Sequence, residues 1–374
     1  MNIFENISNI SEDMQSLQYK TLKNNVQFAS ERKIIETWAE DYVDLDGNFK
    51  RDFQKSFCPQ MWELYLHALF RKANFKRNMD YSAPDYIIES PFKFYVEAAT
   101  ANFRENGSIG VDRTWEDFNE LTKPPYLVDL YKDQLDESIS RVAKKLRDKN
   151  SAYNKYSQND YFELDIPYVV AIGAYDQLNS GKEFIYPMLA LLYGWYFDGT
   201  KNQFCIQNSI TLPNTSKKQE LNLFSQTKFE NISAVIFSCS ITIGKLTALA
   251  ISEGLPTFNA AYSFLETPYE TNRNAYKYLM KKVSKETPEK LEEGVFLFHN
   301  PNAKNPLDEN VFSDLAVTQF FLEEDGVNYK GNISPLVVRK SVSKCMEQVM
   351  KPVLQEHLRM YNRLEPEDFY DINL

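Results

Sequence analysis

Residues 61–100 constrain the fold more than any other stretch, because an apolar helix pattern leads directly into a short hairpin pattern. Apolar residues from Trp62 to Phe70 recur at the spacing of one helix face. Two strand-like runs follow, 85–88 and 92–98, and a Glu-Ser-Pro turn signal separates them. The pattern predicts one helix followed by two antiparallel strands.

The expected hairpin brings two carboxylates together. With a turn centred near Ser90, opposed residues have numbers that sum to about 181–183, so Asp85 faces Val96 or Glu97. Two carboxylates this close repel each other unless a proton or a cation holds them. A hard cation with oxygen ligands, Mg2+ or Mn2+, is the expected partner. Glu63, on the preceding helix, is a candidate third carboxylate. The alternative is that these are ordinary strand-end carboxylates in water.

The order of these residues resembles the PD-(D/E)XK nuclease superfamily, which has the restriction-endonuclease-like fold. The matching positions are Glu63, Pro84-Asp85 and Glu97-Ala98-Ala99, and the resemblance covers roughly residues 55–240. It implies hydrolysis of nucleic-acid phosphodiester bonds, with Glu63, Asp85 and Glu97 as catalytic residues and as the ligands of Mg2+ or Mn2+. One position departs from the pattern, because Ala99 stands where active members usually carry lysine.

The missing lysine leaves three functions open: a metal-dependent nuclease, an inactive nuclease-like fold that binds nucleic acid or protein, and a partner in a larger defence or repair assembly that is active only in complex. Lys93 shares a strand face with Glu97 but lies about 13 Å along the strand, so we expect it to be an exterior lysine. The helix expected over 129–149 carries a cluster of cations: Arg141, Lys144, Lys145, Arg147 and Lys149. They are interpreted as favourable charge at a helix C-terminus, as a phosphate-contacting edge, or as a source of the missing lysine, for which Lys144 and Lys145 are the candidates.

The remaining patterns indicate an α/β fold. Near-continuous apolar runs at 166–175 and 231–239 are typical of central strands that are buried on both faces. Further elements are expected in this order: a helix over 27–43 with Ser30 as N-cap, a buried helix over 183–196, a loop or weak hairpin over 201–222, a strand at 295–298, and helices over 268–283 and 336–362.

We therefore expect a restriction-endonuclease-like core with a mixed β-sheet flanked by helices. The expected organisation is an N-terminal helical extension over 1–50, the core over 51–240, and an α-rich C-terminal elaboration over 241–374. No flexible linker separates the last two segments, which favours an elaboration over an independent domain. The insertion at 101–130 offers Arg104, Arg113 and Trp115 as candidate substrate contacts, although an exposed insertion without function is the simpler interpretation.

Composition narrows the remaining function classes. The four cysteines form no CxxC pair, which argues against a thiolate zinc site. Neither a nucleotide-binding glycine motif nor a serine-nucleophile motif is present. The longest apolar run, 184–197, is too short to cross a bilayer, and the N-terminus lacks a signal-peptide pattern, so we expect a cytoplasmic protein without membrane contact. The expected nucleic-acid partner is DNA. Because the formal net charge is −10, we expect DNA to bind only at a local basic region of the surface. A homodimer is also possible.

Overall fold

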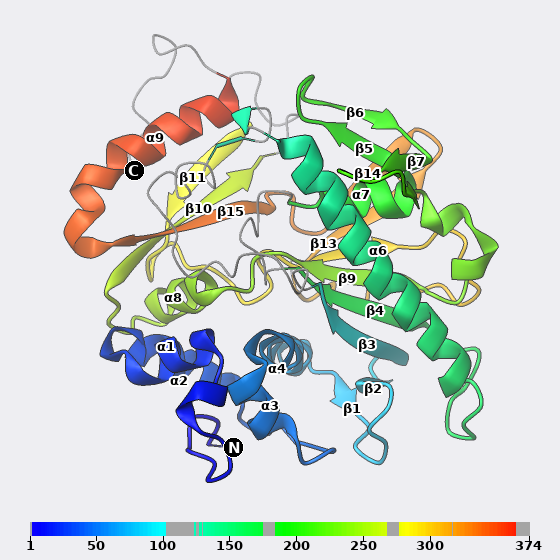
Figure 1. The fold of residues 1–374 in the computed structure, drawn as a ribbon, viewed down its shortest axis with the longest axis horizontal. Coiled ribbons are helices and arrows are strands. Elements are labelled where there is room, and N and C mark those ends of the chain that lie inside the picture. The colour runs from blue at the N-terminus through cyan, green and yellow to red at the C-terminus, as the bar shows by residue number, and fades with distance from the viewer. Residues whose placement is uncertain are drawn as a thin grey trace. The chain divides into compact units, whose positions relative to one another are not determined.

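The computed structural model describes residues 2–101, 123–124, 127–128, 130–174, 184–267, 277–315 and 317–363. The chain divides into two compact units, each made of separate stretches (Figure 1). The first unit comprises Met1–Ser82, Ser240–Gly294 and Ser334–Leu374, and the second comprises Ala83–Cys239 and Val295–Ile333. Each unit therefore draws on residues from both halves of the chain.

The first unit combines helices with a three-stranded antiparallel sheet in the order β11-β10-β15. Its helices are α1 (Leu17–Asn24), α2 (Ala29–Trp38), α3 (Phe49–Lys55), α4 (Phe57–Lys72), α8 (Ile243–Ser252) and α9 (Glu347–Asn362). Its strands are β1 (Lys76–Arg77), β10 (Asn259–Glu266), β11 (Tyr278–Lys282) and β15 (Leu336–Ser343). Helix α4 carries the predicted apolar face, and the rings of Trp62 and Tyr65 stack there with centroids 5.7 Å apart.

The second unit is built on a large mixed sheet, whose strands in this unit follow the order β2-β3-β4-β9-β12-β13-β14. These strands are β2 (Tyr86–Ser90), β3 (Phe94–Thr100), β4 (Tyr168–Gly173), β9 (Ala234–Ser238), β12 (Phe296–His299), β13 (Thr318–Glu323) and β14 (Gly326–Lys330). Two small hairpins add β5 (Trp195–Asp198) with β6 (Gln203–Ile206), and β7 (Ser209–Thr211) with β8 (Lys218–Glu220). Helix α6 (Tyr131–Tyr156) packs on β3 and β4, and α7 (Tyr186–Tyr193) packs on α6 (Figure 1).

The two apolar runs form central strands, as predicted. Strand β4 lies between β3 and β9, is parallel to both, and is buried at every residue. Strand β9 is also fully buried. Because no side chain of β4 or β9 faces water, their sequences read as continuous apolar runs instead of alternating ones. The predicted strand at 295–298 is confirmed as β12, and the weak hairpin predicted within 201–222 as β7–β8.

Several predicted helix limits are wrong. Ser30 lies inside α2 and its hydroxyl donates to the carbonyl of Pro256 at 2.5 Å, so it is not an N-cap. Helix α7 stops at Tyr193 because Gly194 takes a positive φ of 76° and ends the helix, and β5 begins at the next residue. Helix α6 is longer than predicted and continues to Tyr156.

The described part of the C-terminal third is not α-rich. The described part of the predicted helix 268–283 is strand β11, and residues 268–276 lie outside the described residues. The predicted helix 336–362 is strand β15 followed by α9. Strand β15 pairs along β10, so its β-branched residues are used in a sheet and not on a helix face.

Among the residues described, no helix is both long enough and apolar enough to cross a membrane.

Burial of the central strands predicts where the second unit is most sensitive to truncation. Ile236 on β9 is fully buried, whereas Ile206 on β6 is 66% exposed. We expect Ile236→Ala to lower the free energy of unfolding by about 2–5 kcal/mol through lost burial and a cavity. The matched change Ile206→Ala is expected to cost less than about 0.5 kcal/mol. Chemical denaturation of both variants checks this, and equal losses would contradict the assigned core.

Candidate functional site

The β2–β3 hairpin has the register that the sequence predicts. Tyr86 pairs with Val96, so opposed residue numbers sum to 182, within the expected range. Asp85 stands immediately before β2 and is therefore level with Glu97 on β3. The backbone N–H of Ala98 donates to Asp85 Oδ2 at 2.6 Å, and the N–H of Asp85 faces Glu97 Oε2 at 3.4 Å. Each carboxylate is thus held at the backbone of the opposite strand.

A lysine from α6 completes this cluster. Lys149 Nζ lies 2.6 Å from Glu97 Oε1, and Glu97 is only 4% exposed. The sequence predicts Lys144 or Lys145 as the lysine that this helix supplies, but the structure places Lys149 there instead. Lys144 is exposed to solvent. The packing of α6 on β3 and β4 decides which lysine reaches Glu97, and helix periodicity alone does not predict this packing.

Aromatic residues surround the ion pair and fix α6 above the sheet. The Tyr168 hydroxyl donates to the backbone carbonyl of Lys149 at 2.9 Å, and the Tyr153 and Tyr168 rings meet edge to face with centroids 5.2 Å apart. Burial, then the charge of Glu97 and a hydrogen bond to it, raise the pKa of Tyr156, and Asp85 adds to the effect. Tyr156 therefore stays a neutral phenol beside the carboxylates, in surroundings that strengthen the ion pair.

Glu63, the third predicted carboxylate, belongs to the first unit. It lies on α4, where the Tyr42 hydroxyl approaches its Oε2 at 3.5 Å. His67, one turn later, places Nε2 3.2 Å from the carbonyl of Glu40, and burial lowers its pKa. The described contacts therefore bring together Asp85 and Glu97.

Lys93 and His299 make contacts that suit a structural role, and the candidate residues of the insertion are not described. Lys93 forms an exposed ion pair with Glu163 at 2.6 Å, which confirms it as an exterior lysine. His299 is buried, with Nε2 2.8 Å from Gln319 Oε1 and its ring stacked on Phe321. The three candidate substrate contacts of the 101–130 insertion, Arg104, Arg113 and Trp115, lie outside the described residues.

The donor set suits a hard cation. Mg2+ is commonly held by one or two carboxylates, and substrate phosphates and waters supply its remaining oxygen ligands. Asp85 and Glu97 offer such a pair, although the parts of the chain described here contain no group of three or more His, Cys, Asp or Glu placed to hold a metal. The ammonium of Lys149 neutralises Glu97.

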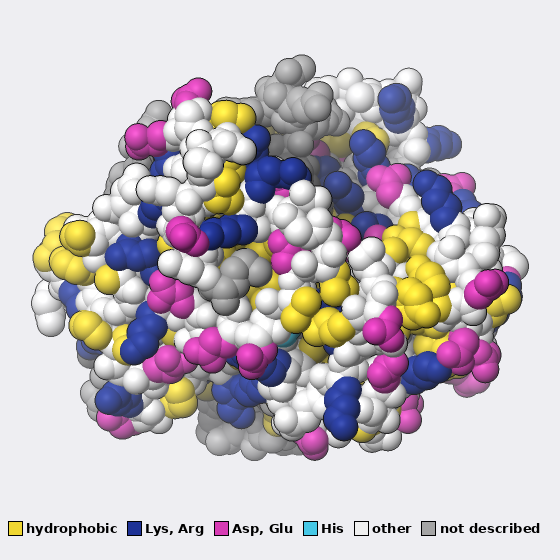
Figure 2. Space-filling view, turned by 90° about the horizontal axis from the view of Figure 1, so that it is seen from below, with side chains coloured by type: hydrophobic (Ala, Val, Ile, Leu, Met, Phe, Trp, Pro, Cys, Tyr) yellow, Lys and Arg dark blue, Asp and Glu magenta, His cyan; other side chains and the backbone are white. Residues whose placement is uncertain are grey.

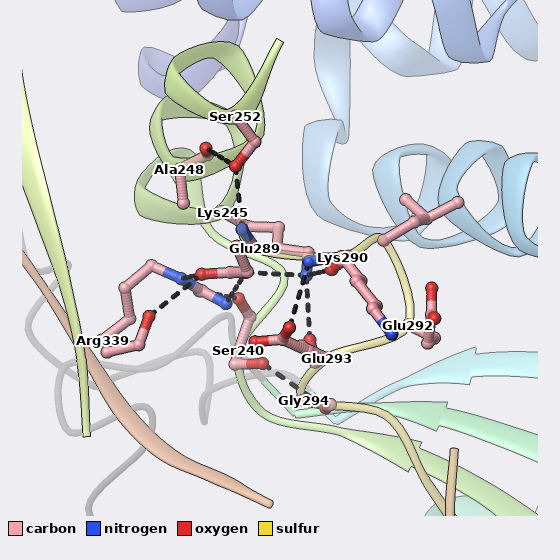
Figure 3. Close-up of polar contacts among 12 residues, drawn as sticks. Ser240, Lys245, Ala248, Ser252, Glu289, Lys290, Glu292, Glu293, Gly294 and Arg339 are labelled. Atoms are coloured by element: carbon pink, nitrogen blue, oxygen red, sulfur yellow. Dashed lines mark hydrogen bonds and ion pairs between the residues drawn. The ribbon is translucent and has the colours of Figure 1, made fainter. Parts of the chain in front are cut away.

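A second polar cluster, not anticipated from the sequence, is buried in the first unit (Figure 3). Lys245 on α8 is fully buried, and its Nζ donates to Glu289 Oε1 at 2.7 Å and to the carbonyls of Lys290 and Glu293 at 2.6 and 2.9 Å. Arg339 on β15 holds the same carboxylate through Nε at 2.8 Å and Nη2 at 2.5 Å. A lone lysine inside the apolar run of α8 was the sequence signal for it.

This cluster is interpreted as a structural connection. Burial alone would raise the pKa of Glu289, but the charges and hydrogen bonds of Arg339 and Lys245 outweigh it and lower the pKa to about 2. Burial lowers the pKa of Lys245 to about 8, and the charge of Glu289 opposes that shift. At neutral pH the cluster is charged and fully engaged, and it joins α8, β15 and the segment 289–293.

Comparison of the chain with protein-family models, with curated proteins and with solved structures gave no match. Any functional assignment therefore depends on the geometry described above.

The low pKa of Glu289 makes the first unit acid-sensitive. Its carboxylate titrates near pH 2 when folded and near 4.5 when unfolded, so the stability that it contributes is present above about pH 4.5 and is lost as the pH falls towards 2. We expect the stability difference between wild type and Glu289→Gln to shrink by roughly 3 kcal/mol between pH 6 and pH 2. Thermal unfolding across this range measures it. Glu253→Gln, an exposed change on the same unit, is the control, and a pH-independent difference for Glu289→Gln would contradict the assignment.

Proposed function

We propose that the protein is a metal-dependent nuclease in which Asp85 and Glu97 hold Mg2+ or Mn2+ and Lys149 supplies the ammonium group of the site. The observation that carries this proposal is the contact of 2.6 Å between Lys149 and the nearly buried Glu97, next to Asp85. Two opposed carboxylates can hold a divalent cation and one ammonium can offset developing negative charge, and these groups suffice for metal-dependent hydrolysis of a phosphodiester.

The alanine at position 99 is the main argument against activity, and Lys149 could supply the charge that Ala99 lacks. In the pattern that the sequence resembles, lysine follows the glutamate by two residues and shares its strand face. Ala99 keeps that place but has no charge to offer, whereas α6 packs over the same strand and brings Lys149 to Glu97. We propose that Lys149 takes the role of the missing lysine.

Each residue then has a defined task. A bound divalent cation would polarise the phosphoryl group and lower the pKa of a bound water. Asp85 and Glu97 would hold that cation. The ammonium of Lys149 would orient the attacking water and offset negative charge as the phosphorus–oxygen bond breaks. Tyr156, a neutral phenol, would donate to Glu97 and fix its orientation.

The order of elements along the chain supports a restriction-endonuclease-like core as part of the proposal. Helix α4 is followed by the β2–β3 hairpin, then by α6 and the parallel strand β4. We further propose DNA as the substrate and the cytoplasm as the location. On the face of the molecule drawn in Figure 2, basic and acidic side chains are interspersed, so substrate contact on that face would be local.

A nuclease-like fold without activity is the second candidate. Lys149 neutralises Glu97, and a satisfied ion pair needs no further cation. Such a protein would bind nucleic acid or another protein through the same fold, and it would keep the ion pair only for structure. Activity measurements separate the two candidates.

The proposal predicts that cleavage of DNA requires all three groups. With Mn2+ or Mg2+ and a panel of single-stranded and double-stranded DNA and RNA, we expect Asp85→Asn and Glu97→Gln to lower the cleavage rate at least about a hundredfold. Lys149→Ala should lower it by a similar factor. Gel analysis of end-labelled substrates gives the rates.

Two controls make this experiment decisive. Lys144→Ala removes an exposed lysine from the same helix and should leave the rate unchanged. Circular dichroism should show that the inactive variants remain folded. Cleavage that survives Asp85→Asn and Glu97→Gln in folded protein would contradict the assigned site. Cleavage by no folded form, wild type included, would favour the inactive fold.

A further inference from the structure

Three cations of α6 follow one another along a single helix face. Arg141, Lys145 and Lys149 are spaced by four residues, so their side chains project from successive turns. The helix continues to Tyr156, so all three lie at least seven residues before its end. The favourable effect of the helix dipole on cations fades within the last turn. Helix-terminal stabilisation therefore does not account for this row.

The middle cation of the row lacks the partner that its neighbours have. Lys149 pairs with Glu97 at 2.6 Å, and Arg141 Nη1 lies 3.6 Å from Glu137 Oε1. Lys145 forms no ion pair with any residue that the structure describes, although a like charge stands one turn away on each side. Asp148 lies three residues further along α6, but no ion pair joins it to Lys145 among the described residues, so the ammonium of Lys145 remains available to an anion.

The direction of α6 places Lys145 next to the carboxylate site. Tyr153 packs on Tyr168, the first residue of β4, while Lys149 reaches Glu97 in the middle of β3, so earlier turns of α6 lie towards the carboxyl ends of these strands. Four helical residues advance about 6 Å and two strand residues about 6.6 Å. Lys145 is therefore level with Ala99, whose small side chain faces α6 from the same side as Glu97.

We propose that Lys145 binds a phosphate of the substrate strand next to the phosphate at the Asp85–Glu97 site. This inference rests on the proposed function and deepens it, because it assigns the substrate as a polyanionic strand that runs along α6 past the carboxyl ends of β3 and β4. The ammonium of Lys145 makes one ionic contact to a non-bridging phosphate oxygen, and Arg141, one turn further, continues the row. The contact carries no base information, so it contributes affinity without sequence preference.

The test is the salt dependence of nucleic-acid binding. Binding of fluorescein-labelled single-stranded and duplex DNA is measured by fluorescence anisotropy in Ca2+ at several salt concentrations, and a gel confirms that the DNA stays intact. We expect Lys145→Ala to weaken binding about tenfold and to lower the slope of log affinity against log salt by about one. Lys145→Arg keeps the charge and should restore both quantities. Lys144→Ala, the adjacent lysine on the exposed side, should change neither.

The outcomes separate this inference from the proposed function. DNA binding by wild type with an unchanged slope in Lys145→Ala overturns the role of Lys145 but leaves the carboxylate site untouched. A lowered slope that Lys145→Arg fails to restore also overturns it, because a lost phosphate contact should return with the charge. Wild type that neither binds nor cuts any form of DNA or RNA overturns the proposed function itself.

Discussion

The ion pair between Lys149 and Glu97 is the interaction on which the polar interior of the second unit depends. Glu97 is almost completely buried beside Asp85, and a buried carboxylate without a partner would be strongly unfavourable. Lys149 can provide the partner only because α6 extends two further turns and is held against the sheet by Tyr153 and Tyr168. The aromatic contacts, the helix length and the charges therefore support one another.

A buried ion pair does not by itself indicate higher stability, because replacing it with apolar side chains of the same volume often leaves the free energy of unfolding unchanged or raises it. The two polar clusters of this protein differ in this respect. Lys245 is fully enclosed and meets three acceptors, whereas the side chain of Lys149 is 24% exposed. One turn away is Lys145, which forms no ion pair with any residue that the structure describes. The first cluster is closed and suits a structural role. The second is partly open, and in the proposed function a bound cation would take the place of its ammonium.

The local features of the fold were predictable, and the long-range ones were not. The Glu-Ser-Pro turn signal predicted the register of β2–β3, and continuous apolar runs predicted the buried strands β4 and β9. Both signals lie in residues that are close in sequence. The extent of α6 and the strand β15 were missed. Polar residues near Tyr156 conceal the end of the helix, and the pairing of β15 with β10 is a tertiary contact that propensity does not report. Lys149 lies inside the predicted helix, but the cation that reaches Glu97 is selected by the packing of α6 on β3, which is also a tertiary contact.

Calorimetric titration of Mn2+ into wild type, Asp85→Asn and Lys149→Met tests most directly whether this cluster is a cation site. The account predicts binding by wild type, loss of binding in Asp85→Asn, and tighter binding in Lys149→Met, because the internal ammonium no longer competes for Glu97. Folded wild type that takes up no Mn2+, or Mn2+ binding that Asp85→Asn leaves unchanged, would contradict it.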